Sequence, residues 1–175
     1  MHEAVAIIDE ALLDEVTSLV EFPVALTGSF DEAFLAVPQE ALILAMKSHQ
    51  KCFHLTDAED RLLPKFVTIS NLESKDPQQV ITGNERVIRP RLADAQFFFD
   101  TDREKPLITR KDSLGSLVFQ DRLGTVLDKC ERVSQLSRQI AEQVSANPAH
   151  CMRAAELSKC DLVTSMVGEF ADLQG

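Results

Sequence analysis

The chain has 175 residues, of which 45% are hydrophobic and 26% are charged, and its formal net charge is −10. This composition excludes an intrinsically disordered chain, and the length suits one domain or one domain with part of another. No apolar stretch is long enough to span a bilayer and no apolar leader opens the chain, so we expect no membrane partner. Residues 1–46 hold nine of the 28 acids and none of the 18 Lys and Arg residues, so the rest of the chain is nearly neutral. A nucleic-acid partner would therefore need a local basic patch.

The first segments read as a helix followed by short strands. Residues 3–20 carry apolar side chains at helical spacing, which predicts an amphipathic helix. Residues 21–30 predict a short strand and a turn in which Gly28 supplies the turn conformation. The apolar run of residues 33–37 predicts another strand. The stripe expected to face the core consists of Val5, Ile8, Leu12, Val16 and Leu19.

A second helix and a hairpin come next. Pro38 is suited to the start of a helix, because a first-turn residue needs no N–H for intrahelical bonding, and the helix is expected to reach residue 50. Two apolar segments flank the polar residues 57–61, which predicts a β-hairpin. Its second arm, from residue 65, has apolar side chains on both faces and is predicted to be well buried.

The segment from Pro77 to residue 99 predicts a third helix. Asp76 can accept a hydrogen bond from the first turn, so it is the expected N-cap. Proline disfavours the helical conformation at the residue before it, so we expect a kink or break near Arg89 and Pro90.

The character of the chain changes after this helix. Residues 101–117 are polar and rich in turn formers, whereas residues 119–145 and the segment from Pro148 onward show helical periodicity. The predicted fold class is α+β: a mixed helix and strand domain over residues 1–105, followed by an all-helical segment over residues 106–175.

Metal and thiol chemistry give no strong signal. The four cysteines match no zinc-binding spacing and include no Cys-x-x-Cys pair, so we expect reduced, largely buried thiols in a cytoplasmic protein. Asp161 stands alone in an apolar stretch, where a carboxylate needs a partner such as Lys159 or Arg153. A single carboxylate does not make a metal site, so no metal ligand is predicted.

One cluster of basic residues lies at the end of the second predicted helix. Lys47, His49 and Lys51 can oppose the negative end of the helix dipole, which is a purely structural role. The functional interpretation is that they contact phosphate or another polar ligand.

A second cluster consists of Arg86, Arg89 and Arg91. The structural interpretation pairs these guanidinium groups with acids of the chain, for example Arg89 with Glu85, four residues earlier, and a neighbouring arginine with Asp94. The functional interpretation is a cluster that binds phosphates, for which arginine offers bidentate geometry. The following Phe97–Phe99 run is expected to bury one or two rings, which would hold the arginines at the surface.

Several long strings also carry a resemblance to a known family. They are EFPVALTGSF, FLAVPQEALILAMKSHQKCF, NLESKDPQQVITGNERVIRPRLADAQFFFDTDR, LGTVLDKCERV and LSKCDLVTSMVGEFADLQG. With these strings the chain resembles the β subunit of the bacterial heterotetrameric (α2β2) glycyl-tRNA synthetase over essentially its whole length. The family subunit is several times longer, so the resemblance implies an internal fragment without the anticodon-binding region.

The resemblance implies a role within a ligase. In that family the α subunit activates glycine with ATP and Mg²⁺, and the β subunit contributes tRNA binding. The implied partners are tRNA(Gly), the α subunit and further β subunits, in the cytoplasm. The fragment alone is expected to be inactive and to hold no cofactor or catalytic residue.

The resemblance also suggests domain types. The first part is similar to the B3/B4-type domain of the phenylalanyl-tRNA synthetase β subunit, and the second to the start of an HD phosphohydrolase domain. The metal-binding His-Asp pair of HD enzymes is missing from the sequence, so no hydrolase activity is implied.

Three functions remain open. In the first, Lys47, Lys51, Arg86, Arg89 and Arg91 form a basic face that holds tRNA phosphates. In the second, the chain is a protein-interaction scaffold that positions the α subunit and other β domains without touching tRNA. In the third, a residual hydrolytic pocket lies near Lys47, with His49 and Glu85 as its polar groups.

Overall fold

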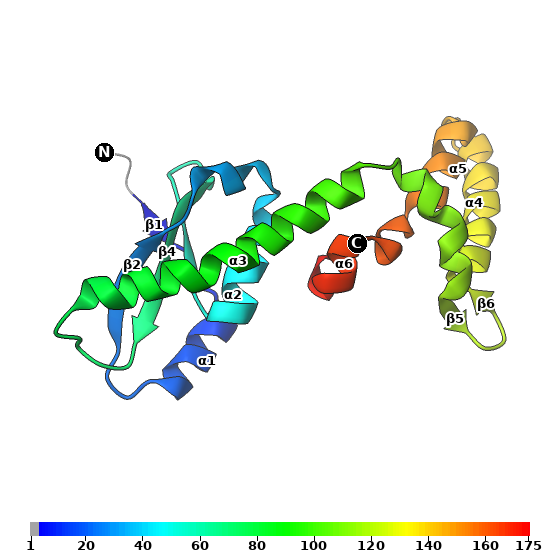
Figure 1. Cartoon of the computed structure of the whole chain (residues 1–175). Helices are drawn as coiled ribbons and strands as arrows, with labels where there is room; N and C mark the ends of the chain where they lie inside the picture. The colour runs from blue at the N-terminus through cyan, green and yellow to red at the C-terminus, as the bar shows by residue number, and fades with distance from the viewer. Residues whose placement is uncertain (1–3) are drawn as a thin grey trace. The chain divides into compact units, whose positions relative to one another are not determined.

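The structure, a computed structural model, describes residues 4–175 as two compact units (Figure 1). The first unit ends at Phe97 and the second is Phe98–Gly175, so the division falls inside helix α3 (Pro77–Arg103). Helices and antiparallel strands occur together, which confirms the α+β class. The domain limits at residues 105 and 106 and the B3/B4-like and HD-like names stay predictions.

The first unit is built on a four-stranded antiparallel sheet in the order β1-β3-β4-β2. The strands are β1 (Val5–Ala6), β2 (Val24–Ser29), β3 (Phe53–Thr56) and β4 (Leu62–Ser70). The predicted hairpin is therefore confirmed as β3 and β4. Its turn is closed by the buried side chain of Asp57, whose Oδ1 accepts hydrogen bonds from the backbone N–H groups of Glu59 and Arg61, both at 3.0 Å.

Gly28 has a different role from the predicted one. It lies inside β2 and pairs with Phe66 of β4, whose ring is fully buried. A Cβ atom at Gly28 would lie 2.8 Å from Cε1 of this ring and closer still to Cζ. The glycine is needed for the close approach of strand and ring, not for a turn.

Helix α1 (Glu10–Leu19) is shorter than predicted, because the chain before it forms strand β1 and pairs with β3. The helix begins after Asp9, whose side chain accepts a hydrogen bond from the N–H of Leu12 at 2.9 Å. Only Leu12 and Val16 of the predicted stripe are buried, and they pack with Phe53 and with apolar residues of β4. The prediction failed because a strand that pairs with a distant partner leaves little local signal.

Residues 33–37 are also not a strand. They belong mainly to a 3₁₀ helix, Glu32–Ala36, which begins where Asp31 accepts a hydrogen bond from the N–H of Ala33 at 2.9 Å. Helix α2 (Gln39–Gln50) follows Pro38, as predicted, and ends at Lys51, whose φ of 53° is left-handed.

Helix α3 continues through Pro90, so the chain does not break there, and the predicted alternative of a kink stays a prediction. Its start is confirmed, because Asp76 accepts a hydrogen bond from the N–H of Gln79 at 3.3 Å. The missing N–H of Pro90 deprives the Arg86 carbonyl of its helical donor, but both residues are exposed and water can replace the donor. The buried face of α3 consists of Ile88, Leu92 and Ala95.

The second unit is mostly helical but contains a small hairpin. Its strands are β5 (Val118–Gln120) and β6 (Gly124–Thr125). The predicted helix of residues 119–145 therefore starts later, as α4 (Val126–Gln143), with a capping box between Thr125 and Asp128. The remaining helices are α5 (Pro148–Leu157), α6 (Ser165–Glu169) and the 3₁₀ helices Leu107–Ser116, Cys160–Val163 and Ala171–Leu173.

The core of the second unit uses only the first part of the apolar stripe of α4 and small residues further along the helix. Cys130, Ser134 and Ala141 of this helix are buried. Val126 and Leu127 at the start of α4 pack against this core. Further along, Leu136 is 55% exposed, and Val144, the residue after the helix, is 66% exposed. Small residues allow α5 to pack closely against α4, and this pushes the larger side chains outward.

The isolated polar groups of the second unit are held by backbone contacts. Asp161 accepts a hydrogen bond from the N–H of Gly175 at 2.9 Å, and no described ion pair joins it to Lys159 or Arg153.

All four cysteines are free thiols, three of them buried. None of the helices within residues 4–175 has the length and apolar character needed to cross a membrane.

Candidate nucleic-acid interface

The three arginines of α3 are exposed side chains without acidic partners in the described part of the chain. Arg86, Arg89 and Arg91 are all exposed, whereas Ile88 and Leu92 of the same helix are buried. No carboxylate among residues 4–175 lies within 4.0 Å of their guanidinium nitrogens. The structural interpretation, in which acids of the chain neutralise all three, is therefore wrong for the described residues.

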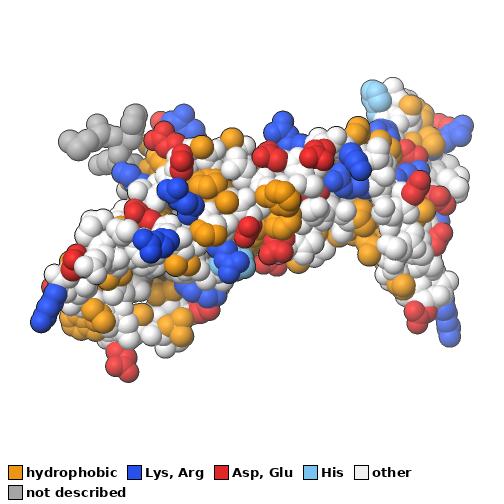
Figure 2. Space-filling model, in the orientation of Figure 1, with side chains coloured by type: hydrophobic (Ala, Val, Ile, Leu, Met, Phe, Trp, Pro, Cys, Tyr) orange, Lys and Arg blue, Asp and Glu red, His pale blue; other side chains and the backbone are white. Residues whose placement is uncertain are grey.

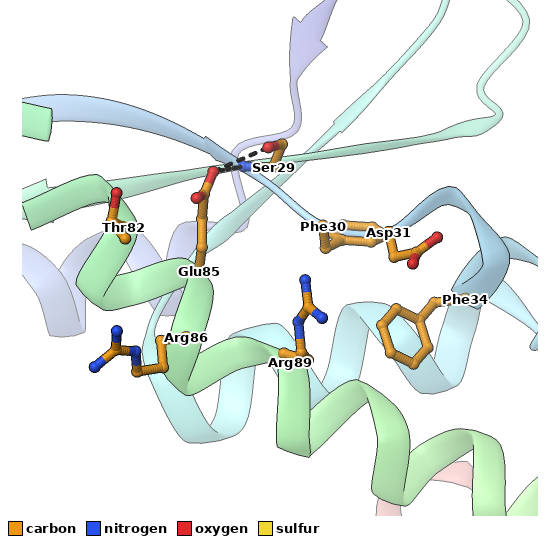
Figure 3. A pocket seen from close by; sticks show the side chains of 8 residues that line it. All are labelled: Ser29, Phe30, Asp31, Phe34, Thr82, Glu85, Arg86 and Arg89. Atoms are coloured by element: carbon orange, nitrogen blue, oxygen red, sulfur yellow. Dashed lines mark hydrogen bonds between the residues drawn. The ribbon is translucent and has the colours of Figure 1, made fainter.

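Two of these arginines border a cavity of about 480 Å³ in the first unit (Figure 3). Arg86 and Arg89 are one helical turn apart, so they project from neighbouring positions on α3. The facing wall comes from the end of β2 and the segment that follows it. The remaining lining residues are Ser29, Phe30, Asp31, Phe34, Thr82 and Glu85.

Each of the two carboxylates of this cavity uses one oxygen for a contact with another element or with its own segment. Oε1 of Glu85 accepts hydrogen bonds from the backbone N–H and the hydroxyl of Ser29, both at 2.9 Å. Asp31 accepts from the N–H of Ala33 and so begins a 3₁₀ helix. The predicted pair between Glu85 and Arg89 does not form, although α3 is continuous, because Glu85 ties α3 to the end of β2.

Arg91 lies apart from the other two. Successive residues of an α-helix are rotated by about 100°, which places Arg91 about 160° from Arg89 around the helix axis. Arg91 is accordingly not among the residues that line the cavity. The cluster seen in the sequence therefore separates into a pair beside a cavity and a single exposed arginine.

The two lysines of α2 differ from the arginines, because both make ion pairs with α1 and the residue before it. The Nζ atom of Lys47 lies 2.5 Å from Oδ2 of Asp9, and that of Lys51 lies 2.8 Å from Oε1 of Glu15. The hydrogen bond from Lys47 is the main reason that the pKa of Asp9 lies below its ordinary value. The acidic start of the chain thus partly neutralises this group of bases.

His49 is exposed near the end of α2. Neither His49 nor Lys47 lines the cavity that contains Glu85, so the three residues of the proposed hydrolytic pocket do not share it. Within the described part of the chain, no group of three or more His, Cys, Asp or Glu side chains could hold a metal ion.

Positive charge forms no single broad surface on the visible face. Figure 2 shows Lys and Arg side chains interspersed with Asp and Glu. A nucleic acid would therefore meet local basic sites, as the charge distribution along the sequence indicates.

Sequence reasoning did not identify the wall opposite the arginines. Ser29, Phe30 and Phe34 belong to a segment about fifty residues before α3, and nothing in their local pattern indicates a ligand site. Thr82 precedes Arg86 by one helical turn, so helical spacing could have placed it beside the arginine.

Comparison with known proteins gives a consistent result over the whole chain. The family model described as glycyl-tRNA synthetase beta subunit matches residues 1–175. A protein named glycine–tRNA ligase beta subunit from Chromohalobacter salexigens is 61% identical over 175 residues, which is 100% of this chain and 25% of the relative. Proteins of the same name from Marinobacter nauticus and Pseudomonas fluorescens are 60% and 57% identical, over 97% and 99% of this chain and 24% and 25% of the relatives. The chain spans about a quarter of the length of these curated relatives.

Proposed function

The chain belongs to the glycyl-tRNA synthetase β-subunit family, and from this premise we propose that it supplies part of the tRNA-binding surface of a glycine–tRNA ligase. The ligase attaches glycine to tRNA(Gly) with ATP in an α2β2 complex. In this proposal the α subunit uses ATP and Mg²⁺, and the chain itself contributes binding rather than a catalytic group. The assembly would contain the α subunit and a second β subunit, and would work in the cytoplasm.

The guanidinium groups of Arg86, Arg89 and Arg91, exposed and without an acidic partner among residues 4–175, carry this proposal. A guanidinium group donates N–H bonds in a planar array that matches phosphate oxygens, and such contacts dominate the affinity of proteins for nucleic acids. The three groups sit on one rigid helix and need not first release an internal carboxylate. Lys47 and Lys51 stay part of the predicted face, but their ion pairs with α1 would weaken their contribution.

Gel retardation of tRNA(Gly) by the 175-residue chain tests the proposal. We expect the triple variant R86A/R89A/R91A to lose most of the retardation at low salt. A charge-matched triple variant serves as the control because it removes three exposed bases from the second unit: Lys105, Arg122 and Arg132. Equal loss in both variants would show that only net charge matters, and retardation that survives in the first variant would overturn the proposal.

The scaffold function is the second candidate, and the exposed apolar face of α4 favours it. Leu136, Ile140 and Val144 project from this face, and a groove of about 460 Å³ lies beside it between α4 and α5. Exposed apolar patches of this kind mark protein contacts. We propose that this face contacts other parts of the synthetase.

Co-purification with the α subunit tests the scaffold function. Ile140→Lys should reduce recovery of the complex. The control variant Gln139→Lys, at the neighbouring exposed position, should leave recovery unchanged. Recovery that is unaffected by both substitutions would exclude this face of α4 from the contact.

A further inference from the structure

The cavity beside α3 holds two positive groups with unused hydrogen-bonding capacity. Neither Arg86 nor Arg89 donates a hydrogen bond to any group within residues 4–175. In Figure 3 the Arg89 side chain projects into the space between Glu85 and Phe34, whereas the Arg86 side chain, one turn earlier on α3, is directed away from Arg89 on the side of Thr82. Side chains three residues apart on a helix have Cβ atoms about 5–6 Å apart, so a rotamer change of the exposed Arg86 side chain would bring both guanidinium groups to one phosphate.

The cavity offers more than an anion site, because it is larger than a phosphate group. Its volume of about 480 Å³ falls in the range of pockets that hold small organic ligands. The rings of Phe30 and Phe34 form part of its wall, and Phe30 is half-buried. An aromatic ring beside a positive site can pack against a nucleobase while the phosphate is bound.

Glu85 adds a third kind of contact. Both of its described hydrogen bonds use Oε1, which accepts from Ser29, so Oε2 is left as an acceptor at the cavity wall. A carboxylate oxygen can accept a hydrogen bond from a ribose hydroxyl, whereas it repels phosphate. The wall therefore presents groups for a phosphate, a sugar hydroxyl and an aromatic base.

We propose that this cavity binds one unpaired ribonucleotide, with its phosphate on Arg86 and Arg89, its 2′-hydroxyl on Glu85 and its base against Phe30. The inference rests on the proposed function, since the nucleotide would belong to the bound tRNA. It adds that this contact selects single-stranded RNA. A base inside a duplex is stacked and paired and does not enter a cavity, and DNA lacks the 2′-hydroxyl.

Fluorescence anisotropy with a short RNA tests this site in the full chain. The probe is a labelled single-stranded trinucleotide RNA, compared with a DNA of the same sequence and with a duplex RNA. We expect the single-stranded RNA to bind several-fold more tightly than either competitor. R86A and R89A should each weaken its binding about tenfold, because each removes a charge-assisted contact.

Arg91→Ala is the matched control for this experiment, because it removes the same charge from the same helix outside the cavity. It should change binding of the trinucleotide by less than about threefold, the size expected for a contact outside the site. Phe30→Leu should weaken the binding of single-stranded RNA and leave the binding of duplex RNA unchanged. An equal loss in R86A, R89A and R91A would overturn the cavity assignment, as would a duplex that competes as well as the single strand.

Two further probes, adenosine 5′-monophosphate and inorganic phosphate, separate this inference from the proposed function. The chain could bind the mononucleotide through Arg86 and Arg89 and still fail to retard tRNA. This result would support the nucleotide site but refute the statement that the nucleotide belongs to tRNA. Retardation of tRNA that depends on the arginines, in a chain whose trinucleotide binding is unaffected by R86A and R89A, would keep the proposed function and refute the cavity. Phosphate that binds as tightly as the mononucleotide would refute the contacts to sugar and base.

Discussion

Asp102, in the last turn of α3, joins three parts of the second unit through its carboxylate. Oδ1 lies 2.7 Å from Nη2 of Arg110 and accepts from the N–H of Ser165 at 2.9 Å, and Oδ2 accepts from the N–H of Met166 at 2.7 Å. The side chains of Asp102 and Arg110 are only 12% and 16% exposed. We predict that Asp102→Ala destabilises this unit more than any loss of a surface ion pair would.

The size of the effect follows from these contacts. Removing one partner of a largely buried ion pair costs about 3–5 kcal/mol, because the remaining charge is left without compensation. Arg110 retains hydrogen bonds to the backbone carbonyls of Asp102 and Lys105, which places the expected loss near the lower limit, at about 3 kcal/mol. Asp102→Asn keeps one acceptor oxygen and should lose roughly half as much.

Urea unfolding followed by circular dichroism measures the loss, and amide hydrogen exchange locates it. The N–H groups of Ser165 and Met166 should exchange faster in the Asp102→Ala variant. Asp100→Ala provides the control, because this aspartate is exposed two residues earlier on the same helix. A loss below about 1 kcal/mol, typical of an exposed ion pair, would refute the reasoning.

The remaining predictions concern packing, pH and thiol reactivity. Gly28→Ala should lower the free energy of unfolding by about 1–3 kcal/mol, because its methyl group would overlap the buried Phe66 ring. Gly83→Ala, in open space on α3, should raise it by about 0.5–1 kcal/mol. Urea midpoints measure both effects. Hydrogen bonds from Thr125, the capping residue, lower the pKa of Asp128. The stability that they provide is therefore present above the unfolded pKa and is lost as pH falls below about 4. Asp128→Asn should remove this part of the acid sensitivity in unfolding curves measured against pH. Burial raises the pKa of the Cys52 thiol to about 11, so little reactive thiolate is present at pH 8. Iodoacetamide at pH 8 should therefore modify the half-buried Cys151 before Cys52, as mass spectrometry would show. Earlier modification of Cys52 would contradict this account.

Elements with local start signals could be predicted from the sequence. Pro38, Asp76 and the pair Asn147-Pro148 mark helix starts that the structure contains, because a cap or a proline acts on its own first turn. The β3–β4 hairpin was also predictable, since its two arms are adjacent in sequence and a polar turn separates them.

Short strands and the choice of the core face were not predictable in this way. Strand β1 exists because Val5 pairs with Thr56, 51 residues away, and no local pattern shows this pairing. The periodicity of α4 correctly indicated a helix, but the interior is filled by small side chains such as Ala141 while Ile140 faces outward. Periodicity shows that an apolar face exists, but the packing partner decides whether that face is buried.

The candidate site shows the same division. The sequence identified the arginines as a charged cluster, yet it could not decide between internal ion pairs and exposure, because Glu85 and Asp94 were both within reach. The outcome depends on Ser29 of β2, which donates two hydrogen bonds to Glu85, so that Glu85 does not pair with Arg89. The separation of Arg91 from Arg86 and Arg89 follows only once the helix is known to continue through Pro90.

The salt dependence of tRNA(Gly) binding tests the central claim most directly. Each phosphate contact contributes about one unit to the slope of log K against log salt concentration, so removing Arg86, Arg89 and Arg91 together should reduce the slope by about two, one for the phosphate shared by Arg86 and Arg89 and one for a phosphate at Arg91. The charge-matched variant of the second unit should keep the slope of the unmodified chain. A slope that stays unchanged in R86A/R89A/R91A would show that these exposed guanidinium groups do not contact the tRNA backbone.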